Sequence, residues 1–224
     1  MQNFLGGLNV FNLIDQFLVP AVAILVCLTI HELAHGLSAY ALGDDTAKRM
    51  GRLTLNPIKH VDPIGFLVLM VVGFGWAKPV PVSPINFKWP RFGMAVTALA
   101  GPVSNFLLTA LVLIFIIPLE RLLNSGGTGA VYTVTILLRI AVISTFLGVF
   151  NLLPIPPLDG SKIVFSFLPD RQYNFLMRYE RYGMLVLLAL LWFGGIMEYL
   201  LVVLRTVYGW IAGWTLPLSI FLFG

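Results

Sequence analysis

One short segment of the sequence carries two histidines and a glutamate at a spacing suited to a metal centre. It reads H-E-L-A-H from His31 to His35 and lies inside a long apolar run. On a helix, residues four positions apart project from one face, so both imidazoles can reach a single ion. Zinc accepts imidazole nitrogen, and Glu32 is placed to take a proton from a water molecule that attacks a carbonyl beside the metal. The predicted chemistry is metal-assisted hydrolysis, with His31 and His35 as ligands and Glu32 as general base.

The histidine pair needs a third ligand, because a catalytic zinc usually takes three from the protein. Asp159 is the candidate, since it follows an apolar run that ends in three prolines between Pro154 and Pro157. Such a run cannot continue as helix and must unwind there. His31 lies about fourteen residues into the first apolar run, or about 21 Å at helical rise, so both sites are expected at similar depth. Asp159 is therefore predicted as the third ligand; the alternative is that Asp159 and Gly160 only form a turn.

The composition indicates that these residues work in lipid. Of the 224 residues, 58% are hydrophobic and 11% are charged, and the mean hydropathy is +0.92, whereas a soluble domain carries about a quarter charged residues. The net charge of +4 is spread over loops, which disfavours nucleic acid as a partner and favours a role in membrane orientation. A helix needs about 20 apolar residues to cross the hydrocarbon. Five segments qualify or nearly do: Phe17–Leu42, Phe92–Pro118, Val131–Leu153, Tyr182–Leu204 and Val207–Phe223.

The segment between the first two spans, Gly43–Arg91, is predicted as an insert associated with the membrane. Its apolar stretch Ile64–Trp76 is too short to cross, and the glycines and prolines in and around it argue against a helix. Short alternations at Leu53–Leu55 and Val80–Ile85 favour extended strands. His60 lies in a polar part of the insert and is expected to be solvated.

The predicted fold is an all-α polytopic membrane protein, with about five transmembrane helices around a three-helix catalytic core and a small re-entrant β-strand and loop insert. We expect one membrane-embedded domain over residues 1–224, with the core at about 17–162 and accessory helices at about 182–224.

The basic residues predict an orientation. The insert carries seven of them and the segment Pro154–Arg181 four, against one in Leu119–Ala130. Because cytoplasmic loops collect Lys and Arg, both basic segments are predicted in the cytoplasm. The active site then lies in the cytoplasmic half of the cell membrane, with the N-terminus outside and, after five crossings, the C-terminus inside.

Four motifs together resemble the site-2 protease family of intramembrane metalloproteases. They cover His31–His35, Gly75–Pro81, Ala100–Asn105 and Asn151–Gly160. The resemblance implies a zinc enzyme that cleaves transmembrane segments of other proteins, often to release a regulator or to clear a signal-peptide remnant. One zinc ion per chain and membrane-protein substrates are expected, and self-association is left open. The chain has no PDZ-like domain between the core spans and no nucleotide-sensing CBS domain is expected after them, so a minimal form of the family is predicted.

Further residues of these motifs are given roles near the metal. By resemblance, Asn151 would stabilise the oxyanion or hold the substrate strand; the alternative is a helix cap or a polar contact between helices. Gly101 and Asn105 stand at i and i+4 and are expected to allow close packing against the histidine-bearing helix. Gly36 is expected to act in the same way.

Two rival functions fit part of the pattern. A CAAX-processing type of membrane metalloprotease also uses H-E-x-x-H but generally takes a glutamate as third ligand, and neither Glu180 nor Glu198 lies in a matching motif. A metal transporter or a zinc-binding scaffold without activity would explain the ligands, but neither Glu32 nor the proline-broken run before Asp159. Zinc itself is inferred from ligand type, and other divalent ions suit the same ligands.

Overall fold

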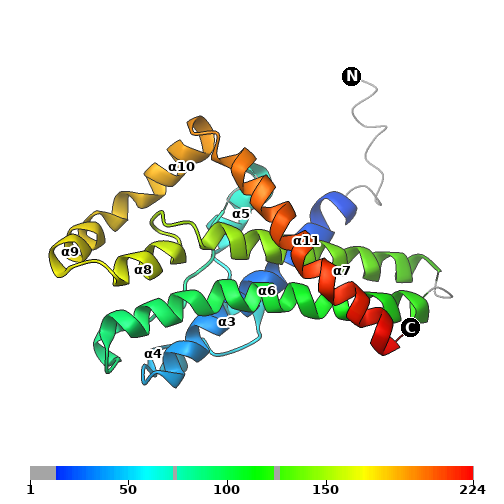
Figure 1. The fold of residues 1–224 in the computed structure, drawn as a ribbon, viewed down its shortest axis with the longest axis horizontal. Coiled ribbons are helices and arrows are strands. Elements are labelled where there is room, and N and C mark those ends of the chain that lie inside the picture. The colour runs from blue at the N-terminus through cyan, green and yellow to red at the C-terminus, as the bar shows by residue number, and fades with distance from the viewer. Residues whose placement is uncertain (1–13, 73–74, 124–126, 224) are drawn as a thin grey trace.

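The computed structural model describes residues 14–72, 75–123 and 127–223, and its regular secondary structure in these ranges is helical (Figure 1). The predicted all-α class is therefore confirmed. Residues 1–13, and with them the predicted position of the N-terminus, lie outside the described residues. The elements are η1 (Ile14–Leu18), α3 (Val19–Ala41), α4 (Thr46–Arg49), η2 (Pro57–Lys59), α5 (Pro63–Val72), η3 (Pro84–Asn86), α6 (Pro90–Leu123), α7 (Gly127–Asn151), α8 (Asp159–Ser166), α9 (Asp170–Tyr179), η4 (Glu180–Tyr182), α10 (Gly183–Phe193) and α11 (Ile196–Phe223).

Helices α3, α6 and α7 pack against one another, and α11 lies against α6 and α7 (Figure 1). Small side chains at the centre, among them Ala23, Cys27 and Ala141, are fully buried and let the helices approach closely. Between α6 and α7, the Thr109 and Thr145 hydroxyls lie 3.0 Å apart. Close packing and hydrogen bonds between helices are what hold a bundle together in lipid, where no hydrophobic force acts between helices. The three-helix core is thus built as its sequence predicts.

Within the described residues, four helices are long and apolar enough to cross a membrane: Gln16–Ala41, Pro90–Arg121, Val131–Asn151 and Ile196–Phe223. The first three match predicted spans, but the two predicted beyond residue 182 are wrong. The chain breaks at Gly194–Gly195, where Gly195 has a positive φ of 62° that glycine adopts readily. Helix α11 then continues without a break from the predicted span Tyr182–Leu204 into the predicted span Val207–Phe223. Helix α10, with 11 residues, is too short to cross.

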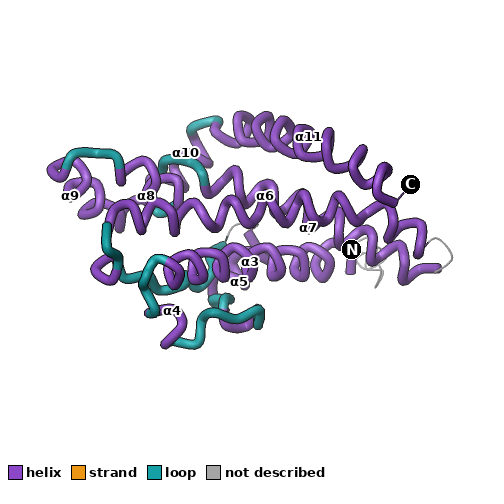
Figure 2. Tube along the Cα trace, turned by 60° about the horizontal axis from the view of Figure 1, so that its bottom comes forward, coloured by secondary structure: helices purple, strands orange, loops and turns teal. Residues whose placement is uncertain are grey.

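The predicted placement of the C-terminus on the side opposite to the N-terminus depends on five crossings, whereas the described residues hold four candidate spans. The end of α11 contacts the end of α6: Arg121 Nη1 donates a hydrogen bond to the carbonyl oxygen of Phe223 at 2.9 Å. Figure 2 shows this end of the bundle opposite α8 and α9. The end of α11 therefore lies at the same end of the bundle as the end of α6.

The insert differs from its prediction in two respects. Helix α5 forms where a helix was not expected, because Pro63 takes its first position, where proline is well tolerated, and Asp62 Oδ1 accepts the Gly65 N–H at 2.8 Å. The strands predicted at Leu53–Leu55 and Val80–Ile85 are absent from the described residues, where an isolated bridge between Val61 and Ala77 is the nearest to a sheet.

Buried polar contacts tie the insert to the end of α3. Asp44 is fully buried and accepts the Ser83 N–H and the Asn86 side-chain amide, each at 2.7 Å. Arg52 Nη2 donates to the carbonyl oxygen of Lys78 at 2.7 Å. His60 is buried and bonds to a backbone carbonyl of the insert, so the predicted solvated histidine is wrong. These contacts hold residues 75–86 in place beside α3.

Candidate metal centre

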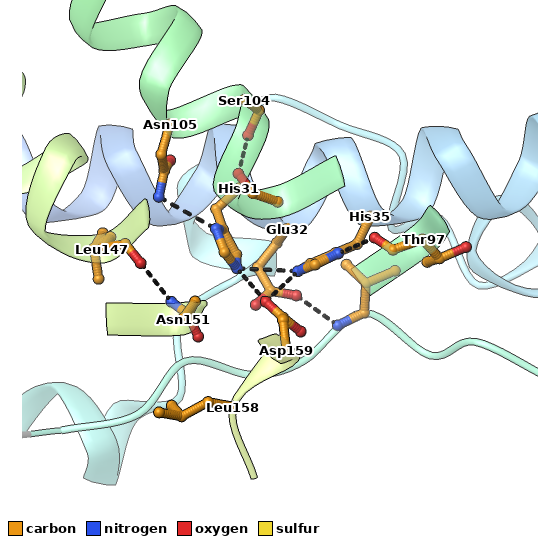
Figure 3. A network of polar contacts seen from close by, with 12 residues as sticks. His31, Glu32, His35, Thr97, Ser104, Asn105, Leu147, Asn151, Leu158 and Asp159 are labelled. Carbon is orange, nitrogen blue, oxygen red and sulfur yellow. Dashed lines mark hydrogen bonds and ion pairs between the residues drawn. The ribbon is translucent and has the colours of Figure 1, made fainter. Parts of the chain in front are cut away.

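The side chains of His31, His35 and Asp159 converge (Figure 3). The two Nε2 atoms lie 3.0 Å apart, and each lies 3.1 Å from Asp159 Oδ2. All three side chains are buried. Tetrahedral ligands at about 2.0–2.1 Å from zinc lie roughly 3.3–3.4 Å apart, so these atoms need to open by only ~0.3 Å to hold the ion. Among the described residues this is the one group of three or more His, Cys, Asp and Glu side chains with such geometry.

His35 is fixed in an orientation that suits a ligand. Its Nδ1 lies 2.7 Å from the carbonyl oxygen of Thr97 on α6, and a carbonyl can only accept, so Nδ1 carries the proton. In the neutral ring the Nε2 lone pair then points at His31 and Asp159. Metal-bound histidines usually donate their other N–H in this way. Since three electron-rich atoms face one another here, the donor set is suited to a cation.

Asp159 is positioned by the break that follows α7. The helix ends at Asn151 and the chain unwinds at the prolines, as predicted, and α8 then begins at Asp159. Gly160 lets the chain return close to the end of α7, since a Cβ there would lie 2.2 Å from the carbonyl oxygen of Leu152. The break thus brings the Asp159 carboxylate to the two histidines of α3.

Glu32 stands beside the cluster and outside it. Its side chain is 9% exposed, and its Oε2 accepts the backbone N–H of Val80 at 2.8 Å. Val80 lies between Pro79 and Pro81, which have no N–H to offer. The insert therefore binds the carboxylate of the predicted general base through a backbone N–H. Glu32 is not a member of the group formed by His31, His35 and Asp159.

A cavity of about 540 Å³ opens onto His31, Glu32, His35 and Asp159. Its other walls are mostly apolar and come from α6, α7, α10 and the insert segment at residues 75–82. Asn151 also lines it, but its Nδ2 donates to the Leu147 carbonyl of its own helix at 3.0 Å. The cavity thus combines mostly apolar walls with the polar side chains of the candidate metal centre.

Of the remaining predicted site residues, Gly101 and Asn105 lie beside the histidines, and Gly36 lies against the insert. A Cβ on Gly101 would lie 2.4 Å from His35 Nε2 and 2.6 Å from His31 Cε1, so this glycine makes room for both imidazoles. Asn105 is fully buried, and its amide nitrogen lies 3.2 Å from His31 Nδ1. Gly36 instead faces the insert, where a Cβ would lie 2.5 Å from the end of the Leu53 side chain.

Two contacts of the site could not be predicted from the sequence. Thr97 and Val80 act through backbone atoms, so their side-chain types gave no signal. The rival glutamates, Glu180 in η4 and Glu198 in α11, are not part of a metal-binding group among the described residues. The geometry thus favours Asp159 over a glutamate as the third partner.

Comparison with known proteins gives one family. Residues 121–194 match Peptidase family M50. The chain is 43% identical over 175 residues to "Putative zinc metalloprotease YwhC" of Bacillus subtilis, which covers 75% of this chain and 78% of that protein. It is 28% identical over 182 residues to "Putative zinc metalloprotease Rip2" of Mycolicibacterium smegmatis, covering 80% of this chain and 68% of the relative. The protein of the same name in Mycobacterium tuberculosis is 26% identical over 199 residues, covering 82% of this chain and 73% of the relative. No solved structure matches significantly.

The buried pair of histidines with an aspartate on a membrane-spanning bundle agrees with these similarities. The chain belongs to peptidase family M50, the site-2 proteases, and is an intramembrane zinc metalloprotease.

Proposed function

We propose that His31, His35 and Asp159 hold the zinc ion and that Glu32 is the general base. The observation that carries the proposal is the convergence of the two Nε2 atoms and Oδ2 at 3.0–3.1 Å. Zinc held there would supply a Lewis acid that polarises the scissile carbonyl and makes water nucleophilic at neutral pH.

The protein's own groups do the proton transfers. Glu32 takes a proton from the attacking water and later gives it to the leaving amine. The Val80 N–H on Oε2 fixes the orientation of the carboxylate, which limits the cost of bringing the base to the water. Asn151 lines the cavity and is proposed to bind the oxyanion or the substrate backbone, for which its amide has to leave the Leu147 carbonyl.

The proposed substrates are membrane proteins cut within or next to a transmembrane segment, to release a regulator or to clear a signal-peptide remnant. The mostly apolar walls of the cavity support this class, because they suit an apolar peptide taken from lipid. A substrate helix hides its peptide bonds in its own hydrogen bonds, so it has to extend locally before attack. The chain is proposed to act as one domain, with residues 17–162 as core and 182–224 as accessory helices.

Zinc content tests the ligand set. Purified protein is expected to hold about one zinc per chain, since one group of three ligands is present. Asp159→Ala is expected to lose zinc on dialysis against a chelator, because two imidazoles alone bind the ion weakly. The matched control is Asp45→Ala, which removes a half-buried aspartate paired with Arg49. Full zinc retention by Asp159→Ala would show that Asp159 is not the third ligand.

Side-specific cysteine labelling tests the orientation. We propose that the insert and the segment Pro154–Arg181 face the cytoplasm, because they carry seven and four basic residues. Cysteines at Lys59 and Arg171 are expected to react from the cytoplasm, and those at Gly127 and Phe223 from the other side. The native Cys27 is buried, so the unaltered chain serves as the unreactive control. Labelling of Gly127 from the cytoplasm would reverse the orientation, and labelling of Phe223 from the side opposite to Gly127 would restore a fifth crossing.

A further inference from the structure

His31 contacts Asn105 on the side of its ring that faces away from the metal centre. Its Nδ1 lies 3.2 Å from the side-chain nitrogen of Asn105, on α6 (Figure 3). Asn105 is fully buried, and within the described part of the chain its Oδ1 is buried with no hydrogen-bond partner. A buried amide oxygen without a partner is costly, so this arrangement needs a physical explanation.

The assigned direction of this hydrogen bond conflicts with metal binding. If the Asn105 amide donates to Nδ1, the neutral His31 ring must carry its proton on Nε2, the atom that faces Asp159 and His35. A protonated Nε2 has no lone pair for a metal. The nitrogen and oxygen of an amide have nearly the same shape, and their assignment follows from the hydrogen-bond network.

Turning the Asn105 amide by half a turn removes the conflict. Oδ1 then lies beside Nδ1 and accepts its proton, and the amide nitrogen takes the buried place that Oδ1 has left. The Nε2 lone pair of His31 is left facing the Asp159 carboxylate. This is the relation that Thr97 already has to His35, where a carbonyl on α6 accepts from Nδ1 at 2.7 Å.

The two acceptors belong to one stripe of α6. Thr97, Gly101 and Asn105 follow one another at intervals of four residues, as do His31 and His35 on α3. Gly101 gives room to both imidazoles, and the residues on either side of it offer each ring an acceptor. The carbonyl of Asn105 accepts the Ser144 hydroxyl of α7 at 2.8 Å, so the backbone at this position is held between helices.

We propose that Asn105 is a positioning residue that selects the His31 tautomer with a free Nε2, by accepting the proton of Nδ1 through Oδ1. The inference rests on the proposed role of His31 as a zinc ligand. It assigns to Asn105 a role beyond the helix packing that its spacing from Gly101 predicts.

Zinc affinity of the full chain, measured in detergent by competition with a chelator, tests the inference. Asn105→Leu fills a similar volume without an acceptor and is expected to bind zinc about 10–100-fold more weakly, the usual effect of losing a partner of a metal-bound histidine. Asn105→Asp keeps an acceptor oxygen at the same place and is expected to stay within a few-fold of wild type. Cobalt-loaded protein gives a second reading, since the visible absorption bands are expected to change in Asn105→Leu and not in Asn105→Asp.

The matched control is Thr109→Val, one turn further along α6. Thr109 is also fully buried and bonds across to Thr145, but it does not touch a histidine, so zinc affinity is expected to stay at the wild-type value. If Asn105→Leu does not fold, Asn105→Ala removes the same acceptor without adding bulk, and the same loss is expected.

Two outcomes would overturn the inference. One is wild-type affinity in Asn105→Leu or Asn105→Ala, and the other is an equal loss in Asn105→Asp, which would show that an acceptor oxygen at this place is not what His31 needs. His31→Ala, measured alongside, separates this from the proposed function. If His31→Ala loses zinc and the Asn105 variants do not, only the inference fails, whereas zinc retention by His31→Ala would refute the ligand set itself.

Discussion

Glu32→Gln is expected to lower peptide-bond cleavage by a factor of about 10²–10⁴ while zinc content stays near one per chain, because a positioned general base usually contributes on that scale. Glutamine keeps the shape of glutamate and an oxygen that can still accept the Val80 N–H at the place of Oε2. It cannot take a proton from water. The ligand atoms belong to His31, His35 and Asp159, so the substitution leaves them in place.

The experiment measures zinc and product together on a membrane-anchored peptide in reconstituted protein. Glu198→Gln serves as the control, since it makes the same chemical change on an exposed position of α11, away from the metal-binding group. A transporter or a zinc-binding scaffold would show no separation between binding and turnover, because it has no water to activate. Wild-type cleavage by a zinc-loaded Glu32→Gln would refute the role of Glu32.

Much of the candidate site could be predicted because local geometry determines it. A helix puts His31 and His35 on one face whatever surrounds them, and prolines after α7 force the chain to unwind before Asp159. Both rules act over fewer than ten residues. The convergence of the two segments then followed from their similar depth in a bundle, and the distances agree with it.

The contacts that hold these side chains could not be predicted in the same way. The Thr97 carbonyl and the Val80 N–H are groups that every residue except proline offers, so residue type carries no information about them. The side chain of Asn105 was visible in its motif, but spacing alone indicated packing. Its relation to His31 Nδ1 depends on how α3 and α6 are placed against each other, which is a tertiary property.

The errors in the fold have a common origin. Hydropathy identifies apolar stretches, but it does not say where a helix stops. Gly194–Gly195 ends one helix and Arg205 lies inside another, although a charge in an apolar run suggests a boundary more strongly than two glycines do. In the insert, Pro63 begins α5, whereas the prediction took the prolines there as evidence against a helix.

Gly101, which lies between Thr97 and Asn105 on one face of α6, is the site of the second prediction with a large expected effect. Gly101→Ala is expected to lower both zinc affinity and cleavage by about 10² or more, since a displacement of about 1 Å at a catalytic centre can cost that much. The new Cβ would lie 2.4 Å from His35 Nε2, 2.5 Å from His35 Cε1 and 2.6 Å from His31 Cε1. Atoms cannot approach so closely, and the rings are held on their other sides by Thr97 and Asn105. The imidazoles have to move, and the ligand atoms move with them.

Two glycines of α11 provide the matched controls. A Cβ on Gly209 or Gly213 would meet nothing within 4 Å, so Gly209→Ala and Gly213→Ala add the same methyl group to a helix without a collision. Both are expected to keep wild-type zinc affinity and to be as stable as the parent or slightly more so, because alanine favours helix over glycine by about 1 kcal/mol. Chelator competition and thermal unfolding of the three variants separate damage at the site from a general effect of alanine in a membrane helix. A Gly101→Ala protein that binds zinc as tightly as these controls would mean that α3 and α6 can part without cost, and that the close approach at Gly101 is not what shapes the metal centre.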